Sequence, residues 1–221
     1  MGSGDRTESR RLRDVSIAIE EMTARNGDVV NERMRAGRVA VAGLGGLGSN
    51  VAVMLARLGV GTLFLVDYDM VEMSNLNRQH YTLKHLGRRK TEAAKSQIAE
   101  INPYVEVLTR DIKITAENAA EIFAGYPIAV EAFDDPACKA GFIGALLGAG
   151  GVKIVAASGM AGLGSANDIK TARRLGSLYL CGDFESQPGD EGIGLLAPRV
   201  IACAAHQANM VARLLMGLDE A

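Results

Sequence analysis

Short runs of apolar residues alternate along most of the chain with longer segments in which apolar residues recur every three or four positions. The short runs predict buried strands and the longer segments predict helices. We expect strands at 39–42, 62–66, 106–112, 128–133, 153–157, 169–173 and 178–180. We expect helices at 50–58, 90–101, 135–147 and 198–216. This alternation predicts an α/β fold in which helices cover both faces of a mostly parallel central sheet.

The first 37 residues are more highly charged and are expected to be helical. Four apolar residues recur there every three or four positions and form one stripe: Leu12, Val15, Ile19 and Met22. Asn26 and Gly27 interrupt this pattern before a second short segment. We therefore divide the chain into a helical extension (1–37) and an α/β domain (38–221). The extension either packs on its own domain, which we favour, or forms a dimer arm.

Length and composition bound the function. The chain has 221 residues, 48% of them hydrophobic, which suffices for one large domain with a substantial core. A formal net charge of −2 gives no electrostatic case for a nucleic-acid or membrane partner. No apolar run reaches the roughly 18 residues of a membrane helix, and a cytoplasmic protein is expected. Cys138, Cys181 and Cys203 form no Cys-x-x-Cys pair, so neither zinc nor a disulfide framework is expected.

A glycine-rich turn joins the first strand of the α/β domain to its helix. It contains Gly43, Gly45, Gly46 and Gly48. Glycines let the backbone approach a phosphate, and the helix N-terminus offers unpaired N–H groups to it. Asp67, at the end of the next strand and close to Asp69, lies about 20 residues further on, where a carboxylate binds ribose hydroxyls. The sequence therefore predicts a nucleotide site in a Rossmann-like βαβ unit, although dinucleotides use the same signature.

Two cations beyond the second strand favour a triphosphate over a nicotinamide dinucleotide. The segment contains Ser74, Asn75, Arg78 and Gln79, and Lys90 opens the next helix. A triphosphate carries additional negative charge that Arg78 and Lys90 can neutralise. We expect these five residues to contact the nucleotide, and Arg78 and Lys90 to be catalytic.

Two adjacent aspartates follow the fourth strand of the domain. Asp134 and Asp135 precede Pro136, at the edge of a parallel sheet where ligands bind. An aspartate pair there can hold Mg²⁺ together with substrate phosphates, which is the role we favour for Asp134. We therefore expect Asp134 to be catalytic, and Asp135, like Asp69 and the glycines of the turn, to contact the nucleotide. The alternative is that Asp134 caps the following helix.

These motifs together resemble the adenylation domain of the ThiF/MoeB family, the bacterial relatives of ubiquitin-activating enzymes. The resemblance spans residues 38 to about 217 and rests on the glycine turn, the Asp67-x-Asp69 pair, the Ser74–Gln79 segment, Lys90 and Asp134. The segment 178–183 and the short length are most similar to the compact ThiF-like proteins of thiamine biosynthesis.

The resemblance implies ATP-dependent adenylation of the C-terminal Gly-Gly carboxylate of a ThiS-like, ubiquitin-fold sulfur carrier protein, by a homodimer. It implies that Gly46 and its neighbours hold the nucleotide and that Asp67 holds the ribose. By the same resemblance Asn75, Arg78 and Lys90 hold the phosphates, and Asp134 holds Mg²⁺.

The chain departs from the family in its cysteines and its N-terminus. Most members carry two Cys-x-x-Cys pairs for zinc, and some carry a reactive cysteine in the loop that corresponds to 188–194; this chain has neither. Adenylation without a thioester step is therefore expected. The arginine that relatives supply across the dimer is not identifiable among Arg10, Arg11, Arg13, Arg25, Arg33 and Arg35. A NAD-dependent oxidoreductase and a non-catalytic nucleotide-binding scaffold stay open as alternatives.

Overall fold

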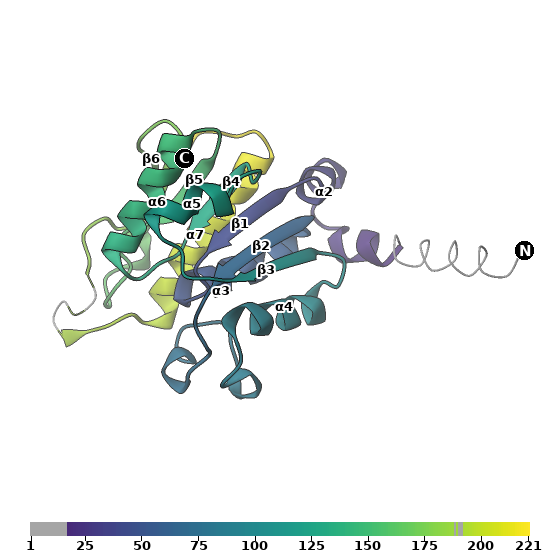
Figure 1. Ribbon diagram of the computed structural model, residues 1–221. Helices are drawn as coiled ribbons and strands as arrows, with labels where there is room; N and C mark the ends of the chain where they lie inside the picture. The colour runs from purple at the N-terminus through teal and green to yellow at the C-terminus, as the bar shows by residue number, and fades with distance from the viewer. Residues whose placement is uncertain (1–16, 188, 190–191) are drawn as a thin grey trace, which may run out of the picture.

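One seven-stranded sheet forms the centre of the molecule (Figure 1). The computed structural model describes residues 17–187, 189 and 192–221, so Leu12 and Val15 of the predicted stripe lie outside the described residues. The strand order is β3-β2-β1-β4-β5-β7-β6, and every neighbouring pair is parallel except β6 with β7. The strands are β1 (Arg38–Ala42), β2 (Thr62–Asp67), β3 (Glu106–Asp111), β4 (Ile128–Glu131), β5 (Lys153–Ala157), β6 (Lys170–Arg173) and β7 (Leu178–Gly182).

Helices cover both faces of this sheet, as the alternating pattern predicts. One face is covered by α3 (Gly46–Leu58), α4 (Lys90–Ile101) and α7 (Ala197–Leu215), the other by α5 (Ala116–Ile122) and α6 (Pro136–Ala149). Successive strand residues alternate between the two hydrophobic cores: Val39 and Val41 of β1 face α3, whereas Ala40 and Ala42 face the α5 and α6 side. The Rossmann-like α/β class is thereby confirmed.

The predicted elements are found within a few residues of their expected bounds, with two differences. α3 begins at Gly46, earlier than the predicted start at residue 50, because the glycine turn itself forms the first helical turn. α5 was not predicted. It has only seven residues, and only Ala119 and Ile122 are buried, so it carries no long apolar period.

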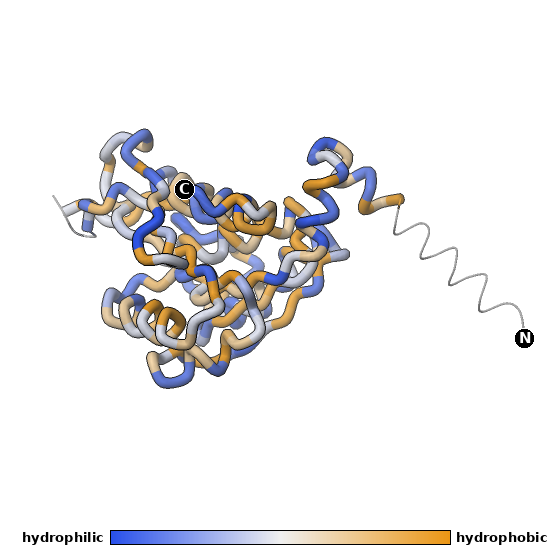
Figure 2. Tube along the Cα trace, turned by 90° about the horizontal axis from the view of Figure 1, so that it is seen from above, coloured by the Kyte–Doolittle hydropathy of each residue, from blue (hydrophilic) through white to orange (hydrophobic). Residues whose placement is uncertain are grey.

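The described part of the N-terminal extension lies beside one end of the sheet (Figure 1). Residues 17–23 are helical, and α2 (Asp28–Arg35) is the next helix. Gly27, which has a φ of 85°, separates the two helices. Met34 of α2 is 1% exposed within the larger core, whereas Ile17 and Met22 stay about half exposed. Hydrophobic and hydrophilic residues alternate along this segment in Figure 2. None of the described helices is long and apolar enough to cross a membrane.

The sheet topology creates one crevice. β1 lies between β2 and β4, so the chain leaves β1 toward one side of the sheet and later returns to pair on its other side. At such a switch point the loops after neighbouring strands diverge and leave a cleft at the carboxyl ends of the strands. The residues after β1, β2 and β4 therefore face one another there.

Candidate functional site

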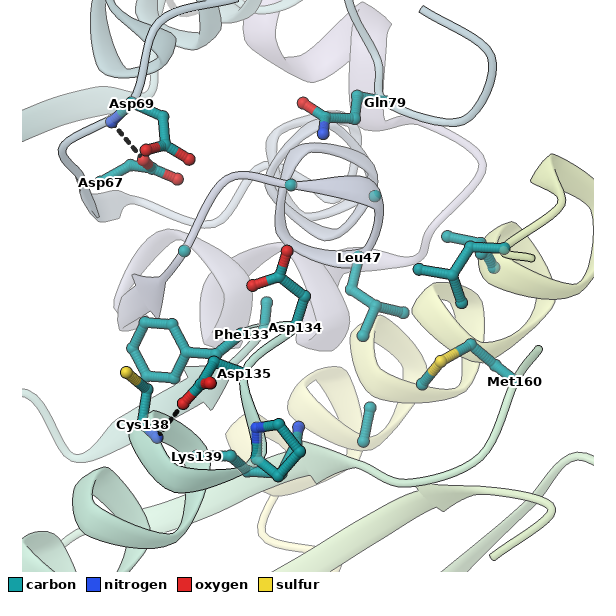
Figure 3. Close-up of a pocket in the computed structure, with 18 of the residues that line it drawn as sticks. Leu47, Asp67, Asp69, Gln79, Phe133, Asp134, Asp135, Cys138, Lys139 and Met160 are labelled. Atoms are coloured by element: carbon teal, nitrogen blue, oxygen red, sulfur yellow. Dashed lines mark hydrogen bonds between the residues drawn. The ribbon is translucent and has the colours of Figure 1, made fainter. Parts of the chain in front are cut away.

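A cavity of about 350 Å³ occupies this switch point (Figure 3). Known ligand pockets hold about 300–1,000 Å³, so the cavity has the size of a ligand site. Most of the residues expected to bind nucleotide line it: Gly43, Gly45, Gly46, Asp67, Asp69, Arg78, Gln79, Lys90, Asp134 and Asp135. The fold thus brings the predicted set together from segments that are distant in sequence.

The glycine turn between β1 and α3 requires glycine at two positions. Gly43 adopts a φ of 88°, a left-handed conformation that other residues rarely adopt. A Cβ atom on Gly48 would lie 1.9 Å from the carbonyl oxygen of Gly43, so any side chain there would displace the turn. Gly45 is the N-cap residue of α3 and provides no side-chain cap, so the first N–H groups of the helix are not capped by a side chain. Such a helix start suits a phosphate.

The Asp67 carboxylate holds this turn against the end of β2. Its Oδ2 accepts a hydrogen bond from the backbone N–H of Leu44 at 2.6 Å, and its Oδ1 accepts one from the N–H of Asp69 at 2.8 Å. Asp67 is only 7% exposed, yet it lines the cavity. Each carboxylate oxygen can accept a second hydrogen bond, so Asp67 can still receive one from a ribose hydroxyl.

Lys90 forms ion pairs with both aspartates of the β2 loop. Its Nζ lies 2.7 Å from Oδ2 of Asp69 and 4.0 Å from Oδ2 of Asp67. The Lys90 side chain is 7% exposed, whereas that of Asp69 is 46% exposed. Asp69 was expected to bind nucleotide, and in the structure it is the closest counter-ion of Lys90.

Arg78 and Gln79 line the cavity, and each carries a buried polar atom without a hydrogen-bond partner among the described residues. Arg78 donates from Nη1 to the carbonyl of Ser74 at 3.3 Å and to Oδ1 of Asn77 at 2.9 Å. Its Nε and the Oε1 of Gln79 are buried and make no hydrogen bond to the described residues. Unpaired buried polar atoms are uncommon and costly, so they indicate a place where a ligand can bind.

Ser74 and Asn75 have local roles. Asn75 accepts a hydrogen bond from the N–H of Glu72 at 3.1 Å through its Oδ1, which caps the short helix η1 (Met73–Asn75). Ser74 is exposed, and neither residue is among the described residues that line the cavity. Their expected nucleotide contact stays a prediction.

The two adjacent aspartates in the turn between β4 and α6 have different contacts. Oδ1 of Asp135 accepts a hydrogen bond from the N–H of Cys138 at 2.7 Å and caps α6, and this bond lowers the pKa of Asp135 below its usual value. Asp134 makes no hydrogen bond or ion pair within the described part of the chain. Its carboxylate is exposed and points toward the glycine turn in Figure 3. The capping role considered for Asp134 therefore belongs to Asp135.

A buried ion pair, which the sequence analysis did not single out, supports this turn. Glu131 is fully buried at the end of β4, accepts the N–H of Phe133 at 2.7 Å, and pairs with Nζ of Lys139 at 2.5 Å. Burial raises the pKa of Glu131, and the nearby Lys139 ammonium opposes that shift. Lys139 also lines the cavity. A glutamate that ends an otherwise apolar strand was the available signal in the sequence.

The other side of the cavity, which we call the far half, is formed by residues after β5 and β7. They are Ser158, Gly159, Met160, Ser186 and Gln187. Asp183 anchors them: its Oδ1 accepts the N–H groups of Glu185 and Ser186 at 2.9 Å, and its Oδ2 pairs with Nη2 of Arg199 at 2.5 Å. The far half was missed, although residues that follow a parallel strand are expected at this edge of the sheet.

None of the three cysteines has the lowered pKa that is typical of a nucleophilic thiol. Cys138 lines the cavity, but a hydrogen bond to Asp135 raises its pKa. Burial raises the pKa of Cys181 to about 11 and that of Cys203 further. Thiolates, not thiols, attack carbonyls and bind metals. Within the described residues no group of three or more His, Cys, Asp or Glu side chains forms a metal site.

Comparisons with known proteins show which proteins this chain is similar to. The adenylyltransferase and sulfurtransferase UBA4 of Saccharomyces cerevisiae is 28% identical over 222 residues, covering 93% of this chain and 50% of that protein. The ubiquitin-like modifier-activating enzyme 5 of Caenorhabditis briggsae is 43% identical over 94 residues, covering 42% of this chain and 22% of that protein. This chain spans half or less of the length of these curated relatives.

Solved structures share the fold. The E. coli tRNA N6-threonylcarbamoyladenosine dehydratase, TcdA, solved in complex with AMP, matches with a TM-score of 0.79 at 21% identity, covering 89% of this chain and 93% of that one. The same protein solved with ATP matches equally well, at 22% identity. The family model described as "ThiF family" matches residues 17–221. Because that match covers nearly the whole sequence, this chain belongs to the ThiF family.

Proposed function

We propose that this chain is an ATP-dependent adenylyltransferase that activates the C-terminal carboxylate of a small ubiquitin-like sulfur carrier protein as an acyl-adenylate, for thiamine-type sulfur transfer. The observation that carries the proposal is the cavity at the switch point. It combines a glycine turn at a helix start, the cations of Arg78 and Lys90, and the Asp134 carboxylate, which has no partner within the described part of the chain. The similarity to UBA4 and to the ubiquitin-like modifier-activating enzyme 5 supports the reaction class, and the ATP and AMP complexes of TcdA support the nucleotide.

The reaction needs little acid–base chemistry from the protein. A C-terminal carboxylate has a pKa of about 3.5, so it is already ionised at neutral pH. One of its oxygens forms a bond to the α-phosphorus of ATP. The bond from that phosphorus to the oxygen bridging the α- and β-phosphates breaks, and pyrophosphate leaves with the electron pair. The residues must align these groups and stabilise negative charge, which the glycine turn, Arg78 and Lys90 are placed to do.

Asp134 fits a magnesium ion. Mg²⁺ in nucleotide sites is held by one or two carboxylates together with substrate phosphates. The Asp134 carboxylate lines the cavity, is exposed to it, and is not engaged by the helix cap. Bound there, the ion would neutralise phosphate charge.

The same arrangement argues against a nicotinamide dehydrogenase. A dinucleotide uses the glycine turn and Asp67 but leaves Arg78 and Asp134 without a ligand. It also does not account for the buried Nε of Arg78 and Oε1 of Gln79, two cavity-lining residues, which have no hydrogen-bond partner among the described residues.

ATP–pyrophosphate exchange tests the proposal. Purified ubiquitin-fold carriers of the thiamine and molybdopterin type are added in turn, each with and without its terminal Gly-Gly. We expect exchange that requires one carrier and its tail. Exchange that no carrier stimulates would contradict the carrier assignment, and binding of NADH without binding of ATP would favour the dehydrogenase. A homodimer, expected from the resemblance, is checked on the same samples by light scattering.

A further inference from the structure

Tyr81 contacts three segments that surround the proposed phosphate site, two of them through its hydroxyl and one through its backbone N–H. The hydroxyl donates a hydrogen bond to the carbonyl of Leu44, in the glycine turn, at 2.9 Å. The carbonyl of Lys90 lies 3.5 Å from the same oxygen. The backbone N–H of Tyr81 donates to the carbonyl of Gln79 at 2.8 Å, next to Arg78.

Tyr81 makes these contacts without touching the ligand space. It is 6% exposed and is not among the described residues that line the cavity. Burial raises the pKa of its phenol well above the usual value, and the nearby Asp67 and Asp69 carboxylates add to the shift. The hydroxyl therefore stays protonated at neutral pH and acts as a donor.

The hydrogen bond to Leu44 closes a loop of contacts. The N–H of Leu44 is held by Asp67, Asp67 lies 4.0 Å from the Lys90 ammonium, and the backbone of Lys90 lies against Tyr81. The N–H of Lys90 also donates to the carbonyl of Asp69 at 3.0 Å. The glycine turn and Lys90 are thus connected in two ways. Asp67 connects the Leu44 N–H to the Lys90 ammonium, and the Tyr81 phenol connects the Leu44 carbonyl to the Lys90 backbone.

We propose that Tyr81 is a positioning residue, whose hydroxyl fixes the distance between the glycine turn and Lys90 so that one triphosphate can contact both. This role rests on the proposed function. Its consequence is specific: AMP, which lacks the β- and γ-phosphates, has less need of a correctly placed Lys90 than ATP has.

Tyr81→Phe removes only the hydroxyl, and Tyr179→Phe is its matched control. Tyr179 is fully buried, its hydroxyl donates to the carbonyl of Asp219 at 3.1 Å, and it lies near the start of β7, at the opposite end of the sheet from the cavity. Each variant loses one hydrogen bond from a buried phenol to a carbonyl, so their melting temperatures should fall by similar amounts. Calorimetric titration then measures the affinities for ATP and AMP.

We expect Tyr81→Phe to weaken ATP binding by about tenfold, the value of one hydrogen bond, while AMP binding changes by less than about threefold. Tyr179→Phe should change both affinities by less than about twofold. In a Lys90→Gln background, Tyr81→Phe should cost less than about twofold further, because two residues that act as one unit are not additive.

The outcomes separate this role from the proposed function. Equal losses of ATP and AMP affinity, or additive losses in the Lys90→Gln background, would assign Tyr81 a merely structural role. An unchanged ATP affinity in Tyr81→Phe, with wild-type binding intact, would overturn the positioning role alone. Failure of the wild-type chain to bind ATP would overturn the proposed function and this role with it.

Discussion

The two halves of the cavity differ in how they present polar groups. One half, which we call the nucleotide side after its proposed ligand, places full charges around the space: the two cations Arg78 and Lys90, and the carboxylates of Asp67 and Asp134. The far half, which comprises Ser158, Gly159, Met160, Ser186 and Gln187, presents backbone, hydroxyl, thioether and amide groups instead.

The charged residues that support the far half are Asp183 and Arg199, and neither is among the described residues that line the cavity. These side chains are 10% and 8% exposed; Asp183 accepts hydrogen bonds from the loop N–H groups, and Arg199 pairs with Asp183. Under the proposed function, the two halves have different tasks. Full charges suit a triphosphate, which the reaction uses whichever acid is activated. Neutral groups on an anchored loop would select among acids by shape and hydrogen bonding.

The largest expected effect comes from breaking the anchor of the far half. Arg199→Ala leaves Asp183 buried without its counter-ion, which typically costs about 3–5 kcal/mol of unfolding free energy. Urea denaturation followed by circular dichroism measures the loss. The protein that remains folded should keep its ATP affinity but require more carrier for half-maximal exchange.

Lys84→Ala is the control for this charge deletion. Lys84 pairs with Glu100, but both side chains are more than half exposed, so its removal should leave stability unchanged. If Arg199→Ala were no more destabilising than Lys84→Ala, the Asp183–Arg199 pair would not be the anchor of the far half.

On the nucleotide side, the cations should control activity more than stability. We expect Arg78→Ala and Lys90→Gln each to lower the rate of pyrophosphate exchange by about 10²-fold, the usual cost of removing a group that stabilises developing charge. Glutamine keeps an N–H donor for Asp69, so the fold should survive, as melting curves can verify. Exchange retained in both variants would refute the assignment of these cations to the phosphates.

Most of the fold was predictable because buried parallel strands are nearly continuous runs of apolar residues. β1 and β2 are such runs, and Gly43 marks the end of the first. α5 was not predicted because its start depends on side-chain capping rather than on apolar periodicity. Thr115 and Asn118 form a capping box at its N-terminus. The Thr-x-x-Asn spacing was visible in the sequence but weaker than a helical repeat.

The nucleotide side was predictable for a different reason. The glycines there allow an unusual backbone geometry and the aspartates provide negative charge. Both properties follow from the residue type alone. Pairings across the chain were not predictable: Lys90 meets Asp69 because Met70 and Arg89 form an isolated β-bridge that brings the two segments side by side. Likewise, only the turn geometry decides which of two adjacent aspartates caps α6.

Those adjacent aspartates allow a sharper comparison within one turn. We expect Asp134→Asn to slow exchange by roughly tenfold or more and to raise the Mg²⁺ concentration needed, because a neutral amide is a poorer ligand for a hard cation. Asp135→Asn is the matched control, since asparagine caps helices as well as aspartate does. Measuring the exchange rate of both variants over a range of Mg²⁺ concentrations tests this expectation. An equal loss in both would show that the turn matters as a whole and that Asp134 is not the specific ligand.

The smallest expected effect is a pH dependence that distinguishes the far half. Burial raises the pKa of Asp183, but hydrogen bonds from the Glu185 and Ser186 amides and from Arg199 outweigh it, so the pKa lies below the ordinary value of 3.8. A carboxyl group with a lowered pKa stabilises the fold fully above that ordinary value and loses the contribution as the pH falls through its own pKa. The stability difference between wild type and Asp183→Asn should therefore be constant from pH 7 to about 5 and shrink below about pH 4. Urea denaturation at each pH measures it. Because protonated aspartic acid and asparagine are both neutral, a difference that stays constant down to pH 3 would mean that the Asp183 charge contributes nothing to holding the far half in place.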